Sequence, residues 1–164
     1  GIACDTVPGI SAAQGAAAAT GIPLTHRDHA AMLVFATGHL QGEEGERTVA
    51  LDWAALARPH QTVVIYMGVG TLPIICAQLI AHGLPASTPA AMIERATLPG
   101  QRSIVGTLQT LPQLSVAYGV NPPALVMIGD TVALHARIGS SAEVLTGFPA
   151  VVDAASPQAL ACTA

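Results

Sequence analysis

The sequence predicts an α/β fold in which helices flank a mixed β-sheet. Its 164 residues suffice for one domain or one large lobe. Of these residues 51 % are apolar and only 10 % are charged, so a core can form without disulfides and a disordered chain is excluded. Short, nearly continuous apolar runs alternate with segments that have helical spacing of apolar residues, and Gly and Pro residues separate them. That alternation is typical of buried strands covered by helices.

The clearest predicted helix spans residues 12–20. Ser11 stands three residues before Gln14, which is the capping-box spacing, and the alanine-rich run ends at Gly21. Three further helices are predicted from apolar spacing, caps and stops: residues 53–57 after Asp52, residues 71–82 before Gly83, and residues 111–118 after Thr110, which repeats the capping-box spacing to Gln113.

The clearest predicted strand is TVVIYM at residues 62–67, which is rich in β-branched and aromatic residues. Shorter apolar runs predict the other strands, at residues 30–36, 90–94, 103–108 and 124–128. Beyond Arg137 the pattern fades into Gly, Ser and scattered Ala, so residues 138–164 are expected to form a loosely ordered tail.

Charge, hydropathy and cysteine content exclude several classes of protein. The net charge is −4 and the six cations are scattered arginines, which argues against a nucleic-acid surface. No run reaches the roughly 18 apolar residues of a membrane span, and no export signal is visible, so a cytoplasmic protein is expected. Cys4, Cys76 and Cys162 are odd in number and far apart, so neither a disulfide framework nor a Cys-x-x-Cys site is predicted.

General motifs do not assign a chemistry. Gly68-Val-Gly70 lies between a predicted strand and a predicted helix, but Pro73 occupies the third glycine position of a dinucleotide-binding fingerprint. His26, His29 and His39 have no fourth ligand at a recognised spacing, so no metal site is predicted. Glutamates 43, 44 and 46 lie in a glycine-rich stretch that is expected to be a solvated loop.

Longer strings are more specific when they are taken together. They are VPGISAA (7–13), GIPLTHR (21–27), TGH (37–39), YMG (66–68), IERAT (93–97), QR (101–102), GTL (106–108) and PALVMIGD (123–130). This series resembles the tetrapyrrole methylases. The strings PLTHR, TGH and YMG are most similar to the members that methylate uroporphyrinogen III at carbon. The resemblance covers about residues 7–134.

The resemblance implies the C-terminal domain of a two-domain fold that holds S-adenosylmethionine in the cleft between the domains. Residues 1–10 would be a remnant of the inter-domain linker, and residues 11–137 the domain itself. The family's GxGxGD loop and its acid–base residues have no counterpart here. No catalytic residue is therefore expected in this chain, which would need an N-terminal domain for activity and would assemble as a homodimer.

The resemblance places the methyl donor against six residues from three segments: Pro8, Ser11 and Ala12; Met67; Ala96 and Thr97. A helix N-terminus offers free N–H groups to a polar ligand. The soft thioether of Met67 suits a site that fits a sulfonium against a macrocycle. A small residue at position 96 allows the backbone to approach the donor closely.

The tetrapyrrole would be bound by Arg27, His26, His39 and Met67. Uroporphyrinogen III is a polycarboxylate, and the guanidinium of Arg27 can grip a carboxylate through two hydrogen bonds. The net charge of −4 opposes long-range attraction of such a polyanion, so the attraction must be local. Gln101 and Arg102 belong to the shared strings, but the sequence leaves open whether they serve the cleft or the fold.

The implied reaction is methyl transfer to C2 and then C7 of uroporphyrinogen III, which gives precorrin-2 for sirohaem or cobalamin and releases S-adenosylhomocysteine. No metal, nucleic acid or membrane is expected to take part. Two alternatives stay open. In the first, the chain is a non-catalytic binding or dimerisation module, and in the second it is part of a methylase that acts on a later precorrin.

Overall fold

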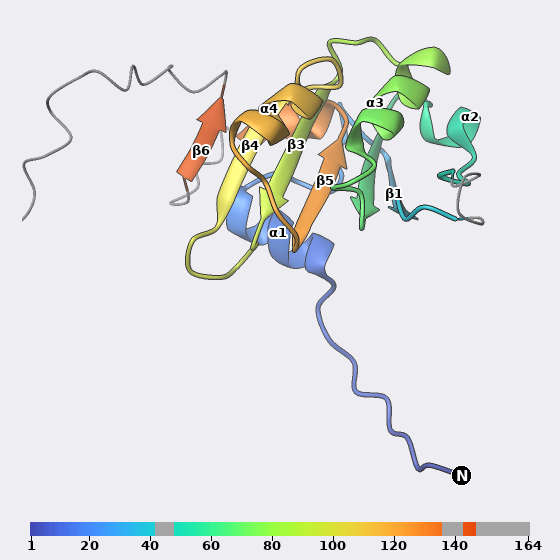
Figure 1. The fold of residues 1–164 in the computed structure, drawn as a ribbon, viewed down its shortest axis with the longest axis vertical. Helices are drawn as coiled ribbons and strands as arrows, with labels where there is room; N and C mark the ends of the chain where they lie inside the picture. Colours follow the sequence, from blue (N-terminus) through green and yellow to red (C-terminus); the bar gives the residue numbers. More distant parts are fainter. Residues whose placement is uncertain (42–47, 136–142, 147–164) are drawn as a thin grey trace, which may run out of the picture.

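The computed structural model describes residues 1–41, 48–135 and 143–146. They form one six-stranded sheet with the order β1-β2-β5-β3-β4-β6 (Figure 1). The strands are β1 (Met32–Thr37), β2 (Gln61–Tyr66), β3 (Pro89–Glu94), β4 (Arg102–Thr107), β5 (Ala124–Ile128) and β6 (Glu143–Thr146). The pairs β1–β2 and β4–β6 are parallel and the other three are antiparallel, so the predicted mixed sheet is confirmed.

Helices cover both faces of this sheet. The helices are α1 (Ala12–Thr20), α2 (Trp53–Leu56), α3 (Leu72–Ala81) and α4 (Leu111–Ala117), followed by the 3₁₀ helix η1 (Asp130–Leu134). Ala13 and Ala16 of α1 pack on one face with Met127 of β5, whereas Ile75 and Leu79 of α3 belong to the core on the other face. Because side chains alternate along a strand, β2, β3 and β5 contribute to both cores and are buried almost throughout.

The predicted ends of α1 are confirmed. The Ser11 hydroxyl accepts a hydrogen bond from the Gln14 N–H at 3.3 Å, and the Gln14 side chain accepts one from the Ser11 N–H at 2.9 Å. The helix ends at Gly21, whose φ of 71° is left-handed. These local contacts satisfy backbone groups that a helix end otherwise leaves unpaired.

The capping box predicted at Thr110 and Gln113 is wrong. Thr110 makes no side-chain cap bond to α4. Its hydroxyl instead accepts a hydrogen bond from the Thr107 N–H at 2.9 Å and lies 3.2 Å from the Thr107 hydroxyl. The Thr110 hydroxyl, which the sequence spacing predicts to cap α4, therefore stabilises the turn between β4 and α4 instead.

The strand predicted at residues 124–128 has the same bounds in the structure, the other predicted elements are present with ends that differ by at most two residues, and two elements were missed. Sequence patterns predicted neither η1 nor β6, although residues 143–146 pair in parallel with Arg102–Val105 of β4. The remainder of the segment 138–164 lies outside the described residues, as do Glu43, Glu44, Glu46 and Cys162. The predicted domain boundaries remain a prediction.

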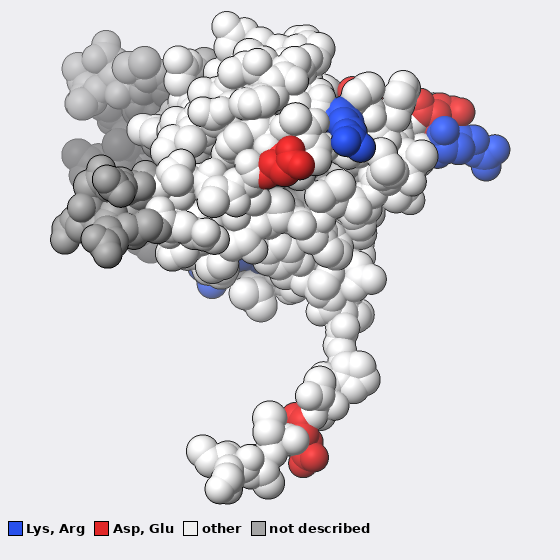
Figure 2. Space-filling view, turned by 90° about the vertical axis from the view of Figure 1, so that its right-hand side faces the viewer, with Lys and Arg blue, Asp and Glu red and all other residues white. Residues whose placement is uncertain are grey.

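Charged side chains are sparse on the face drawn in Figure 2, most of which is uncharged, and at its right-hand end an acidic and a basic side chain adjoin each other. Among the described residues, no helix is long and apolar enough to cross a membrane. Over the same ranges, no group of three or more His, Cys, Asp or Glu side chains is arranged to hold a metal ion.

Cys76 on α3 should resist alkylation until the protein unfolds. The residue is 2 % exposed, and burial raises the pKa of its thiol from 9.0 to about 12. Iodoacetamide at pH 8 should modify the exposed Cys4 in the native protein and Cys76 only in denaturant, as read by peptide mass spectrometry. Equal rates of Cys76 alkylation in native and denatured protein would contradict this assignment.

The raised pKa of the Cys76 thiol predicts that the protein loses stability at alkaline pH. The unfolded thiol loses its proton first, so the contribution of Cys76 is complete below pH 9 and declines between pH 9 and about 12. A Cys76→Ala variant should show a shallower decline of the free energy of unfolding across this window.

Candidate functional site

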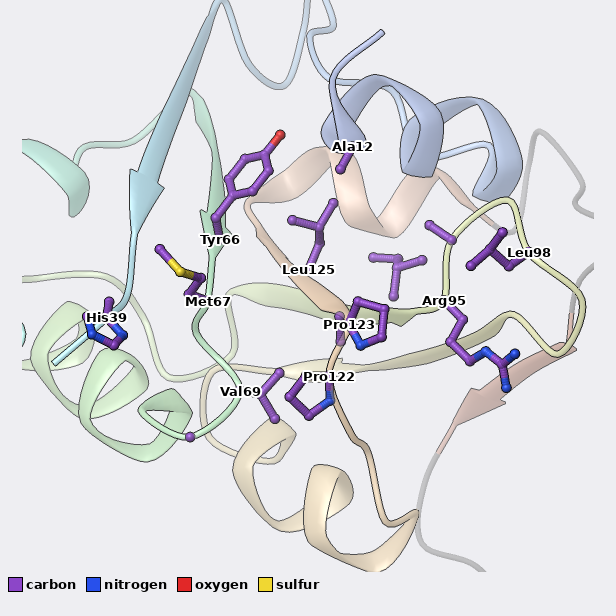
Figure 3. Close-up of a pocket in the computed structure, with 14 residues that line it drawn as sticks. Ala12, His39, Tyr66, Met67, Val69, Arg95, Leu98, Pro122, Pro123 and Leu125 are labelled. Atoms are coloured by element: carbon purple, nitrogen blue, oxygen red, sulfur yellow. The ribbon is translucent and has the colours of Figure 1, made fainter. Parts of the chain in front are cut away.

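A pocket of about 510 Å³ opens at one edge of the sheet (Figure 3). Apolar side chains and backbone form most of its wall, and Tyr66, His39 and Arg95 are its polar or charged members. The lining residues are Ala12, His39, Tyr66, Met67, Val69, Gly70, Ile93, Arg95, Ala96, Leu98, Pro122, Pro123, Ala124 and Leu125. An apolar cavity of this size with a few convergent polar groups is typical of a small-molecule site.

The sheet topology explains where the pocket lies. Strands β2 and β3 flank β5, and both run antiparallel to it. Their C-terminal ends therefore meet at the edge where β5 begins, and α1 begins at the same edge, where the Ala13 N–H meets Tyr66. Segments that are distant in the sequence thus contribute to one wall.

The backbone adopts an unusual conformation around the pocket. Three of the four non-glycine residues with positive φ in the described chain are Met67 (φ 53°), Arg95 (φ 51°) and Thr97 (φ 67°). Each such residue costs on the order of 1–3 kcal/mol, and such conformations cluster at functional sites. The arrangement therefore marks the ends of β2 and β3 as candidates for ligand contact.

Side-chain contacts hold the strained segment after β3 in place. The Thr97 N–H donates to Oε1 of Gln101 at 2.6 Å, and Nε2 of the same side chain donates to the Ala19 carbonyl at 3.5 Å. Gln101 thus closes the 97–101 turn and ties it to α1. These contacts give Gln101 a role in the fold, next to the pocket residues Ala96 and Leu98, and a role toward a ligand stays a prediction.

Tyr66 links β2 to the start of α1. Its hydroxyl oxygen accepts a hydrogen bond from the Ala13 N–H at 3.1 Å, and its ring meets Phe35 edge-on at 6.0 Å. Figure 3 shows the Tyr66 side chain directed toward the α1 end of the pocket. Sequence reasoning singled out Met67 and overlooked Tyr66, although both belong to the string YMG.

The pocket brings together four of the residues predicted to bind the donor or the tetrapyrrole. They are Ala12, Met67, Ala96 and His39, from four separate segments. Met67 is 60 % exposed and therefore accessible to a ligand.

Three other predicted donor contacts lie outside the pocket lining. Ser11 precedes Ala12 and caps α1, Thr97 follows Ala96 and is exposed, and Pro8 lies in the exposed segment before α1. Their predicted contacts with the donor remain predictions.

The remaining substrate candidates, Arg27 and His26, are not part of the pocket wall. They lie in a turn closed by a bridge between His26 and Ala30. Nδ1 of His26 accepts a hydrogen bond from the Asp28 N–H at 3.2 Å, and the Arg27 side chain is exposed. Their predicted role in binding a tetrapyrrole is therefore separate from the pocket itself and stays a prediction.

Comparisons with known proteins agree with these features. The family model for Tetrapyrrole (Corrin/Porphyrin) Methylases matches residues 1–112. Siroheme synthase from Nitrosomonas europaea is 52 % identical over 132 residues, which are 80 % of this chain and 27 % of that protein. Siroheme synthase from Nitrosospira multiformis is 51 % identical over 138 residues, which are 84 % of this chain and 28 % of that protein.

Solved structures give the same family. The native form of uroporphyrin III C-methyl transferase from Thermus thermophilus superposes with a TM-score of 0.64 at 31 % identity, over 78 % of this chain and 51 % of that one. A complex of the Thermus enzyme with S-adenyl homocysteine has a TM-score of 0.64 at 32 % identity, over 79 % of this chain and 52 % of that one. The chain thus spans less than a third of the siroheme synthases and about half of the Thermus enzymes. It belongs to the tetrapyrrole methylase family.

Proposed function

We propose that this chain forms the C-terminal half of an S-adenosylmethionine-dependent enzyme that methylates uroporphyrinogen III at C2 and C7 and gives precorrin-2. The observation that carries the proposal is that Ala12, Met67 and Ala96, from three distant segments, line the same pocket. The similarity to a methyl transferase complexed with S-adenyl homocysteine supports the same ligand chemistry for this chain.

The pocket residues fit such a donor. A cavity of about 510 Å³ lies within the range of small-molecule sites, and its apolar wall suits a ligand with a large apolar surface. The polarizable thioether of Met67 can contact a sulfonium without competing for a hydrogen bond. When bound, S-adenosylmethionine supplies the electrophilic methyl group.

The chain's contribution to the reaction is positioning. Attack at carbon needs nucleophile, methyl and sulfur nearly in line, and holding two reactants in that geometry lowers the entropic part of the barrier. Ala12 and Ala96 let the backbone approach the donor, while Pro122, Pro123 and Leu125 exclude water from one side. In this proposal the groups that abstract protons come from the other half of the enzyme.

Calorimetric titration with S-adenosylhomocysteine tests the proposal. The complete gene product should bind it with a micromolar dissociation constant, and Met67→Ala should raise that constant at least tenfold, about 1.4 kcal/mol. Met32→Ala is the matched control, because Met32 is 48 % exposed and lies outside the pocket lining. Failure of the wild-type protein to bind would refute the proposal.

A second candidate is an assembly module that does not bind the donor. Phe35 and Met32 on β1 are 52 % and 48 % exposed, and β1 is at the edge of the described sheet. An edge strand with exposed apolar side chains is prone to pair with another chain. Sedimentation velocity that shows a dimer, with no binding of S-adenosylhomocysteine, would favour this candidate. Product analysis of the complete enzyme separates a uroporphyrinogen III methylase from one that acts on a later precorrin.

A further inference from the structure

An ion pair between the buried Glu94 and the half-buried Arg102 adjoins the pocket residues Ile93 and Arg95. Glu94, the last residue of β3, is 6 % exposed and stands opposite Arg102, the first residue of β4. Nε of Arg102 donates to Oε2 of Glu94 at 2.7 Å, and Nη2 forms an ion pair with the same oxygen. A buried carboxylate is costly unless it is paired and its remaining oxygen is hydrogen-bonded.

The second oxygen of Glu94 binds the segment that leads into β5. Oε1 accepts a hydrogen bond from the Asn121 N–H at 3.1 Å. Arg102 reaches the same segment, because Nη1 donates to the Tyr118 carbonyl at 3.0 Å and Nη2 to the Gly119 carbonyl at 3.5 Å. These two carbonyls follow α4, where a helix end leaves acceptors unpaired and favours a cation.

The segment held in this way continues into the pocket wall. Pro122 and Pro123 both line the pocket, and neither has a backbone N–H that a neighbour could bind. On their C-terminal side, the Pro123 carbonyl accepts a hydrogen bond from the Arg95 N–H at 2.9 Å. On their N-terminal side, the contacts of Glu94 and Arg102 supply the restraint.

We infer that Glu94 and Arg102 are positioning residues that set the Pro122–Pro123 wall for the ligand of this pocket. The pair touches backbone on residues 118, 119 and 121, and it does not line the pocket itself. The inference rests on the proposed function for the identity of the ligand, S-adenosylmethionine, and on the hydrogen bonds for the role of the pair.

Two conservative variants of the complete gene product test the inference. Arg102→Lys keeps the charge but replaces the three nitrogens of the planar fork by one, so Glu94 and the two carbonyls lose the separate nitrogens that now contact them. Glu94→Gln keeps an acceptor for the Asn121 N–H but removes the charge that holds Arg102. We expect Arg102→Lys to raise the dissociation constant for S-adenosylhomocysteine about tenfold and Glu94→Gln about threefold. The KM for S-adenosylmethionine should rise in parallel, with kcat at saturating donor within twofold of the wild type.

Thr62→Val is the matched control. It removes the buried hydrogen bond of 2.8 Å between the Thr62 and Thr131 hydroxyls, and Thr62 lies near the opposite end of β2 from the pocket. It should lower the melting temperature without changing the dissociation constant. If Arg102→Lys and Glu94→Gln also lower only the melting temperature, the pair is merely structural and the inference is wrong.

Amide hydrogen exchange tests the restraint on the Pro122–Pro123 wall in the absence of a ligand. Arg102→Lys should accelerate exchange of the Asn121 and Leu125 amides several-fold relative to Thr62→Val. If wild-type protein does not bind S-adenosylhomocysteine, the proposed function fails, and accelerated exchange then still supports the restraint on the wall. Unchanged exchange at these amides in both Arg102→Lys and Glu94→Gln would refute the restraint, whatever the protein binds.

Discussion

Replacing Gly129 with alanine should lower the free energy of unfolding by about 3 kcal/mol or more. Gly129 has φ 130° and ψ 171°, a region that is essentially restricted to glycine. A Cβ atom there would lie 2.6 Å from the Gln61 carbonyl oxygen, which belongs to the backbone of β2 and cannot rotate away. The Gly129 N–H also donates to the Pro89 carbonyl, so the loop cannot shift without breaking this bond. Urea unfolding followed by circular dichroism measures the loss.

Gly83→Ala is the control that separates conformational strain from the clash. Gly83 has φ 114°, but nothing lies within 4 Å of the position of its Cβ atom. Alanine there should cost only the strain of an unfavourable φ, on the order of 1–3 kcal/mol. A loss for Gly129→Ala no larger than that for Gly83→Ala would show that the contact with β2 relaxes at little cost.

Local signals decided which elements the sequence could predict. The ends of α1 follow from Ser11, Gln14 and Gly21, which act within one helical turn of the residues they cap. Thr110 has the same spacing to a glutamine as Ser11, yet its hydroxyl binds the Thr107 N–H instead. The difference is that Thr110 lies only three residues after the end of β4, so the tight turn after the strand competes with the helix for the Thr110 hydroxyl. The spacing alone does not indicate this competition.

The tertiary parts of the site were not predictable from local patterns. Ala12, Met67 and Ala96 were singled out because they belong to family strings. Pro122 and Pro123 were not singled out as site residues. They reach the same pocket because β5 inserts between β2 and β3 in the sheet, and no short-range signal in the sequence encodes that order.

The positions of Glu94 and Arg102 in the sequence already indicate that the two residues pair. Glu94 ends a predicted strand, and Arg102 immediately precedes the next one. In an antiparallel hairpin, residues at these two positions face each other across the turn. An acid and an arginine at such positions predict a cross-strand pair, although the contacts of Arg102 with residues 118 and 119 depend on the packing of α4.

Ala12→Phe should abolish donor binding while leaving the fold intact. Ala12 is the first residue of α1, is exposed, and lines the pocket, so a phenyl ring there extends into the space proposed for S-adenosylmethionine. We expect the dissociation constant for S-adenosylhomocysteine to rise at least a hundredfold, about 2.8 kcal/mol. The free energy of unfolding should change by no more than about 0.5 kcal/mol, as is usual for an exposed position.

Ala18→Phe makes the same substitution on the same helix, away from the pocket. Ala18 is exposed, and it does not line the pocket. Both variants add the same apolar ring to α1, so any difference in their affinity for S-adenosylhomocysteine, measured by calorimetry, reports the location of the ligand. Wild-type affinity in Ala18→Phe together with lost binding in Ala12→Phe places the donor at the α1 end of the pocket. Equal affinities in the two variants would mean that the donor binds elsewhere, and the convergence of Ala12 with Met67 and Ala96 would then have only a structural cause.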